Sequence, residues 1–129
     1  MAFNHIVVVS TILVALLLSN TSVAIESTQY VVGDSSGWTI DYDYIAWAKS
    51  KVFRVGDTLV FNYPKGIHNV FKVNGTAFAN CIIPPPSEAY TSGHDIIALS
   101  APGKTYFLCG VEEHCSEFNQ KLAIYVRAS

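Results

Sequence analysis

Two histidines and one cysteine in the C-terminal half of the sequence could together hold a metal ion. His68 opens an apolar run, Cys109 ends another, and His114 follows Cys109 by five residues. Two imidazoles and one thiolate are the strong ligands of a type-1 copper site, which a weak axial ligand completes. Thiolate favours Cu(I), whereas imidazole tolerates both oxidation states. These residue types therefore indicate a copper site suited to one-electron transfer.

The chain contains three cysteines, so a single disulfide would leave one thiol unpaired. The spacing leaves all three pairings of Cys81, Cys109 and Cys115 open. A Cys81–Cys115 bond would leave Cys109 free at the end of an apolar run. It would also close a loop of about 35 residues, which stabilises a fold by about 3–4 kcal/mol in the chain-entropy model. A bound metal would then protect the Cys109 thiol from oxidation.

Two alternatives to copper use the same residues. In the first, the chain has one disulfide, one buried free cysteine and surface histidines, and it binds no metal. In the second, Cys81, Cys109, His114 and Cys115 bind zinc. The adjacent residues His114 and Cys115 are poorly placed to reach one tetrahedral ion together. His94 is interpreted as a turn residue rather than as a ligand.

A β-rich scaffold is predicted to position these residues. Apolar residues recur at every second position in short runs bounded by turn residues, which is typical of half-buried strands. Six or seven strands favour an antiparallel β-sandwich or barrel, and residues 44–51 are predicted to form a short helix. Asn74-Gly75 is interpreted as a hairpin turn and, with Thr76, as a glycosylation sequon. The predicted strands cover residues 29–32, 52–55, 58–63, 69–73, 96–99, 105–109 and 122–126.

The composition argues against several classes of protein. The chain has 129 residues, of which 50% are hydrophobic and 14% charged, which suits one folded domain rather than a disordered protein. Its formal net charge is −2 and it has no basic run, so we expect no nucleic acid and no anionic membrane surface as a partner. The sequence shows no Ser-His-Asp grouping and no phosphate-binding loop, so we do not expect an enzyme.

The N-terminus is typical of a secretory leader. Its apolar run, over residues 6–18, is shorter than the about 20 residues that a membrane-spanning helix needs. Ser22 and Ala24 are small residues in the positions that signal peptidase requires. We predict cleavage after Ala24, which leaves residues 1–24 as the leader and residues 25–129 as one domain without a membrane span. An uncleaved anchor is the alternative, because no Lys or Arg precedes the apolar run.

Four motifs occur in order along the chain and cover nearly all of the predicted mature part. They are residues 30–38 (YVVGDSSGW), 53–63 (FRVGDTLVFNY), 68–70 (HNV) and 103–115 (GKTYFLCGVEEHC). Together they resemble the plant phytocyanins, a family of blue copper proteins. The resemblance implies an all-β, cupredoxin-like Greek-key sandwich, with one or two short helices in its connections and copper near one end.

By matching position, the resemblance makes His68, Cys109 and His114 the equatorial copper ligands. It also makes Cys81 and Cys115 the disulfide of the family. Some relatives have lost the copper ligands, but this sequence retains all three strong ones.

The axial position departs from the family pattern, which usually reads His-Cys-x-x-Gly-(Met or Gln)-Lys. Here the stretch from His114 to Lys121 has one extra residue and no glycine. When Gln-Lys is aligned with Gln-Lys, the axial ligand is Gln120, as in the stellacyanin-like branch of the family. Counting forward from His114 gives Asn119 instead. We favour Gln120, because the buried alternation of the last strand determines its register.

The resemblance implies a secreted mononuclear copper protein that transfers one electron. We expect a monomer in the apoplast, at the cell wall or plasma membrane, with an unidentified small-molecule or protein redox partner. His114 is the expected point of electron entry. The alternative, from another class, is an extracellular recognition or signalling module in which copper redox cycling is not the main role.

Overall fold

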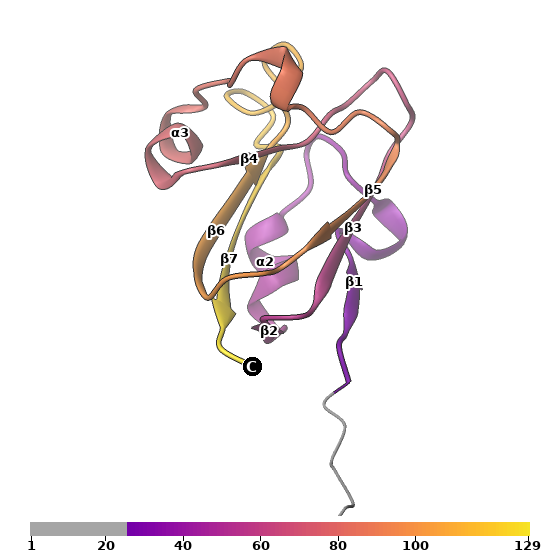
Figure 1. The fold of residues 1–129 in the computed structure, drawn as a ribbon. Helices are drawn as coiled ribbons and strands as arrows, with labels where there is room; N and C mark the ends of the chain where they lie inside the picture. The colour runs from indigo at the N-terminus through magenta and orange to yellow at the C-terminus, as the bar shows by residue number, and fades with distance from the viewer. Residues whose placement is uncertain (1–25) are drawn as a thin grey trace, which may run out of the picture.

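The computed structural model describes residues 26–129, so the leader predicted over residues 1–24 lies outside the described part. Two β-sheets form the body of the domain, and short helices lie in the connections between strands (Figure 1). Within residues 26–129, no helix has both the length and the apolar character needed to cross a membrane.

In the described part of the chain, seven strands build the two sheets, and each matches a predicted strand to within a few residues. The first sheet has the order β1 (Gln29–Val31), β3 (Thr58–Asn62) and β5 (His94–Ala98). The second has the order β2 (Phe53–Arg54), β7 (Lys121–Arg127), β6 (Gly103–Leu108) and β4 (Phe71–Val73). The period-two pattern therefore located the strands correctly.

The predicted antiparallel arrangement is wrong for two of the strand pairs. Strand β1 pairs with β3 in parallel, and β2 pairs with β7 in parallel, so both sheets are mixed. The other pairs, β3–β5, β4–β6 and β6–β7, are antiparallel. A parallel pair needs a long crossover between its strands. The period of side-chain alternation is the same in both kinds of pair, so the pattern cannot indicate direction.

The core lies between the two sheets. Alternate residues of β3 and β7 point inward, among them Leu59, Phe61 and Leu122, and all three are fully buried. Trp38 and Trp47 are buried in the same cluster. A packed core of this kind makes the strands rigid. The candidate ligands lie just outside the ends of two strands of the second sheet, before β4 and after β6.

Helix α2 (Tyr44–Lys49) confirms the helix predicted over residues 44–51. Asp43 caps its N-terminus: the Asp43 side chain accepts a hydrogen bond from the Ala46 N–H at 3.0 Å. Such an N-cap satisfies a backbone donor that the first helical turn leaves free. Tyr44 and Trp47 on its inner side are buried and attach the helix to the core.

The hairpin predicted at Asn74-Gly75 is wrong, because this dipeptide begins helix α3 (Gly75–Asn80). The Asn74 side chain accepts a hydrogen bond from the Ala77 N–H at 2.9 Å and caps the helix. Asparagine suits both tight turns and N-caps, so the dipeptide alone is ambiguous. Packing of Phe78 against Tyr106, with ring centroids 5.1 Å apart, fixes the helix on β6. Two short 3-10 helices, η1 (Asp34–Ser36) and η2 (Pro86–Glu88), complete the connections.

Candidate metal centre

Three segments that are separated in sequence meet at one end of the sandwich. His68 precedes β4, Cys109 directly follows β6, and His114 lies in the loop between β6 and β7. Two backbone hydrogen bonds hold that loop against the end of β6. The Cys109 N–H donates to the Gln120 carbonyl at 3.0 Å, and the Gln120 N–H donates to the His114 carbonyl at 2.9 Å. These two bonds bring the ends of the loop together, so that Cys109 and His114 lie next to each other.

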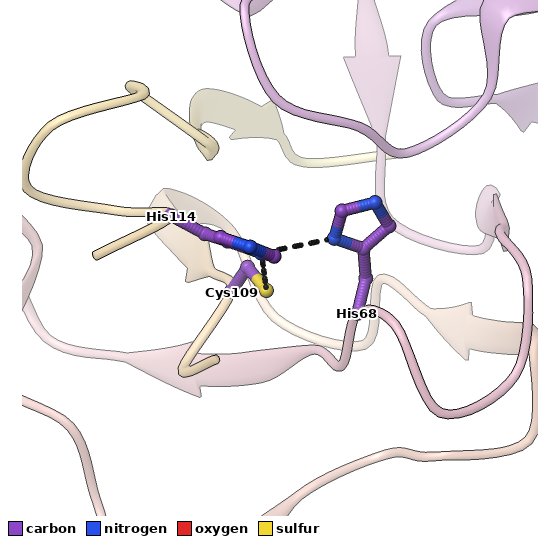
Figure 2. A group of neighbouring side chains, drawn as sticks. All are labelled: His68, Cys109 and His114. Atoms are coloured by element: carbon purple, nitrogen blue, oxygen red, sulfur yellow. Dashed lines mark hydrogen bonds between the residues drawn. The ribbon is translucent and has the colours of Figure 1, made fainter. Parts of the chain in front are cut away.

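The side chains of His68, Cys109 and His114 point toward one another (Figure 2). One ring nitrogen of each histidine and the Cys109 Sγ atom all lie within 4.8 Å of one another. The two Nδ1 atoms are 3.0 Å apart, and Cys109 Sγ is 3.6 Å from His114 Nδ1. Cys109 is completely buried and His68 is 8% exposed, whereas the residue His114 is partly exposed. Two of the three candidate ligands are therefore buried, and His114 is the one that solvent or a partner can contact.

Asn69 connects the His68 segment to the Cys109 segment, a role that the motif of residues 68–70 did not indicate. Its side-chain Oδ1 accepts a hydrogen bond from the Gly110 N–H at 2.7 Å. Its carbonyl accepts another from Trp38 Nε1 at 2.9 Å. In the sequence, Asn69 was marked only as the middle residue of the HNV motif, directly after His68. Asn69 therefore connects both ligand segments to the core.

The surroundings set the protonation of the candidate ligands. Burial raises the pKa of the Cys109 thiol, while the backbone N–H groups of Asn69 and Val111 oppose that rise by favouring the thiolate. Burial and then the neighbouring His114 lower the pKa of His68 below its ordinary value. A neutral imidazole and a thiolate are the forms that bind metal. The site therefore favours the binding form of His68, and metal binding at Cys109 must displace the thiol proton.

Gln120 carries a buried amide without a partner on the segment that bonds to both Cys109 and His114. Its side chain is 0% exposed, and neither Oε1 nor Nε2 has a hydrogen-bond partner. A buried amide without a partner is strongly unfavourable, so such a group requires an explanation. Its backbone bonds to both Cys109 and His114, which places the residue beside the cluster. Asn119, by contrast, is exposed. The residues present thus fit a copper ion, with Gln120 better placed than Asn119.

The remaining cysteines form the disulfide that the family resemblance implied. Cys81 and Cys115 are bonded, with their Cα atoms 5.8 Å apart, and Cys109 is the buried free thiol. The zinc alternative is therefore excluded, because it used both bonded cysteines as ligands. His94 is also separate from the cluster: it begins β5, where its ring contacts the Asn62 side chain.

Gly110 leaves no space for a side chain next to the site. A Cβ atom there would lie 2.4 Å from Phe71 Cε2 and 2.8 Å from Ile83 Cγ2, and Phe71 is buried. We expect Gly110→Ala to lower the free energy of unfolding by about 1–3 kcal/mol, the usual effect of overpacking. Urea unfolding of the copper-free protein measures this change.

Gly75→Ala is the matched control for this variant. The nearest atom to a Cβ at Gly75 is the Tyr106 hydroxyl oxygen, 3.3 Å away at the end of a side chain. Alanine also favours a helix over glycine, by about 1 kcal/mol. Equal destabilisation by Gly110→Ala and Gly75→Ala would contradict the expected steric overlap between a Cβ at Gly110 and the side chains of Phe71 and Ile83.

The sequence is similar to that of known copper proteins. A family model described as a plastocyanin-like domain matches residues 38–119. A "Blue copper protein" of Petunia hybrida is 67% identical over 102 residues, which are 79% of this chain and 38% of that protein. "Blue copper protein 1b" of Medicago truncatula is 52% identical over 128 residues, 99% of this chain and 77% of that protein. The chain thus spans well under half of the Petunia protein and about three quarters of the Medicago protein.

Solved structures agree with these similarities. Cucumber stellacyanin, in a structure described with Cu²⁺, superposes with a TM-score of 0.75 and 37% identity, over 81% of this chain and 99% of that one. Cucumber basic protein, described as a blue copper protein, superposes with a TM-score of 0.68 and 43% identity, over 76% and 98% of the two chains. The shared architecture covers most of the part of the chain that the structure describes.

Proposed function

The chain belongs to the phytocyanins, the plant blue copper proteins with a plastocyanin-like domain, and from this premise we propose that it carries single electrons outside the cell. Its fold is cupredoxin-like and its cofactor is one type-1 copper ion. The observation that carries the proposal is the His68, Cys109 and His114 cluster, next to a buried Gln120 amide without a partner.

We assign His68, Cys109 and His114 as the equatorial ligands and Gln120 as the axial one. Copper, when bound, supplies an ion that alternates between Cu(II) and Cu(I). The chain contributes rigidity, because Asn69 and the backbone bonds of Gln120 hold the ligand segments in place. Little rearrangement between two oxidation states means a low barrier to electron transfer.

His114 is the ligand through which a partner can approach most closely. His114 is partly exposed, whereas Cys109 and His68 are buried. Phe118, which is 37% exposed, lies beside it with ring centroids 6.5 Å apart. A redox partner that docks over this edge is separated from the site by a single imidazole. The ligand set is filled by side chains of this chain, which suits an electron carrier better than an enzyme.

Voltammetry of the copper-loaded protein tests electron transfer. We expect one reversible one-electron wave and fast electron self-exchange between oxidised and reduced protein. A sluggish or absent wave from correctly folded, copper-loaded protein would contradict the proposal. It would instead support the alternative, an extracellular recognition module in which copper cycling is not the main role.

The axial assignment predicts a change in reduction potential. An amide oxygen favours Cu(II) more than a thioether does, so we expect Gln120→Met to raise the potential. Asn119→Met is the matched control, because Asn119 is exposed and should leave the potential unchanged. The measurement is the voltammetric midpoint of each variant. A raised potential in Asn119→Met alone would transfer the axial role to Asn119.

We also propose that the chain is secreted and carries a glycan on Asn74. Expression in a plant secretory system should yield a mature N-terminus at Ile25 and a heavier protein that an N-glycosidase reduces in mass. Thr76→Ala should remove this mass difference, because it destroys the sequon and keeps the Asn74 cap of α3. N-terminal sequencing and mass spectrometry measure both results. An N-terminus at Met1 would indicate an uncleaved anchor.

A further inference from the structure

The outer face of the second sheet carries an apolar surface far from the candidate metal centre. Two shallow depressions, of about 310 and 270 Å³, meet along Ala123, Ile124 and Tyr125 of β7. Both are open to solvent. Tyr125 is 61% exposed, and Ile45 on α2, at 66%, lines the first depression with it. We call this surface the Tyr125 face. Exposed apolar side chains grouped in this way mark interaction sites.

The charges around the Tyr125 face are all positive. Lys49, Lys51 and Arg127 line the first depression and Lys104 lines the second, which together are four of the eight lysines and arginines in the chain. No described residue that lines either depression is acidic. This grouping occurs in a chain whose formal net charge is −2.

A depression at the end of the molecule with the metal centre is lined by acidic residues. Asp41, Asp43 and Glu117 line a depression that also contains Phe118, the neighbour of His114. Strand β7 runs from this end toward the C-terminus (Figure 1), and Tyr125 lies five residues beyond Gln120. At about 3.4 Å per residue, that separation is about 17 Å. These charges attract an anion to the Tyr125 face and repel it from the acidic depression beside Phe118.

We propose that the Tyr125 face binds an acidic polysaccharide of the polyuronate type. Its exposed tyrosine ring offers a flat apolar surface, on which the C–H face of a sugar ring can pack. Register places Lys104 directly opposite Tyr125, and Arg127 follows two residues along the same face of β7. Cations on two sides of the ring match carboxylates on successive sugars. An open, shallow surface suits an extended chain, whereas a small ligand is usually bound in an enclosed pocket.

Calorimetric titration of the copper-loaded protein with oligogalacturonate tests the proposal. We expect saturable binding that weakens as salt is added, because exposed charges are screened. The fully methyl-esterified oligomer keeps the sugar rings and loses the charges, and it should not bind. Lys104→Glu should weaken binding about tenfold, since reversal turns an attractive charge pair into a repulsive one. Tyr125→Ala should weaken it as well, through loss of the ring.

Lys72→Glu is the matched control, because Lys72 is an exposed strand lysine on β4 outside both depressions. It changes the net charge by the same amount and should leave the affinity unchanged. Equal weakening by Lys72→Glu and Lys104→Glu, with no effect of Tyr125→Ala, would overturn the proposal in favour of general charge attraction. Binding of poly-glutamate but not of oligogalacturonate would assign the face to an acidic peptide.

Two further measurements separate this proposal from others. Sedimentation of the protein alone should show a monomer; a dimer that Lys104→Glu dissociates would assign the face to a second copy of this chain and overturn the proposal. The copper-free Cys109→Ser protein should bind oligogalacturonate as tightly as the copper-loaded protein. Sugar binding is therefore tested independently of electron transfer. Loss of binding in the folded copper-free variant would show that the copper end, and not the Tyr125 face, recognises the polymer.

Discussion

Cys109→Ser should abolish the intense blue absorption that the copper-loaded protein is expected to show. That absorption arises from charge transfer between a thiolate and Cu(II), and Cys109 is the free cysteine in the described part of the chain. The other two cysteines are bonded to each other. A serine hydroxyl is a poor ligand for copper and has no equivalent transition. Addition of one equivalent of Cu(II), followed by a visible spectrum, measures the effect.

Two controls make this result specific. Cys109 is completely buried, so far-ultraviolet circular dichroism must show that the copper-free variant remains folded. His94→Ala removes a histidine that lies outside the cluster and should keep the blue band. A blue band that persists in folded Cys109→Ser protein would remove Cys109 from the site, and the electron-transfer proposal would fall with it.

The double variant Cys81→Ala/Cys115→Ala should lower the free energy of unfolding by about 3–4 kcal/mol. This is the chain-entropy value for the 34-residue separation that the disulfide closes. A domain of this size has a small total stability, so the loss is a large fraction of it. The bond also anchors Cys115, the residue after His114, to the end of α3. We therefore expect weaker copper binding as well.

Denaturant unfolding of copper-free protein measures this second prediction. The comparison is made in the Cys109→Ser background, so that the remaining thiol cannot exchange with the disulfide during unfolding. A stability within about 1 kcal/mol of the disulfide-bonded parent would show that the unfolded chain is already compact around this loop. Copper affinity is compared separately, in protein that keeps Cys109. An unchanged affinity would show that backbone bonds alone, such as that from the Gln120 N–H to the His114 carbonyl, hold the ligand loop.

The spacing of apolar residues and the types of the ligand residues determined much of the fold and of the site. The alternation of Leu122, Ile124 and Val126 located β7, because a strand with one buried face must repeat every two residues. The types of His68, Cys109 and His114 indicated copper before any contact was known. The resemblance to the phytocyanins added the Cys81–Cys115 bond, which the spacing alone had left as one of three options.

Only the tertiary structure decided the direction of strand pairing, the conformation at Asn74-Gly75 and the burial of Gln120. The direction of the β1–β3 and β2–β7 pairs depends on how the connections cross the sandwich, and alternation is the same in either direction. Asn74-Gly75 suits a hairpin and a helix cap equally, and the packing of Phe78 on Tyr106 selects the helix. Burial separates Gln120 from Asn119, because only long-range contacts determine which of two adjacent amides faces the interior. The sequence by itself thus determined the local conformations and the chemistry of the ligands. The packing of distant segments decided which strands pair in parallel, which face α3 packs on and which amide is buried.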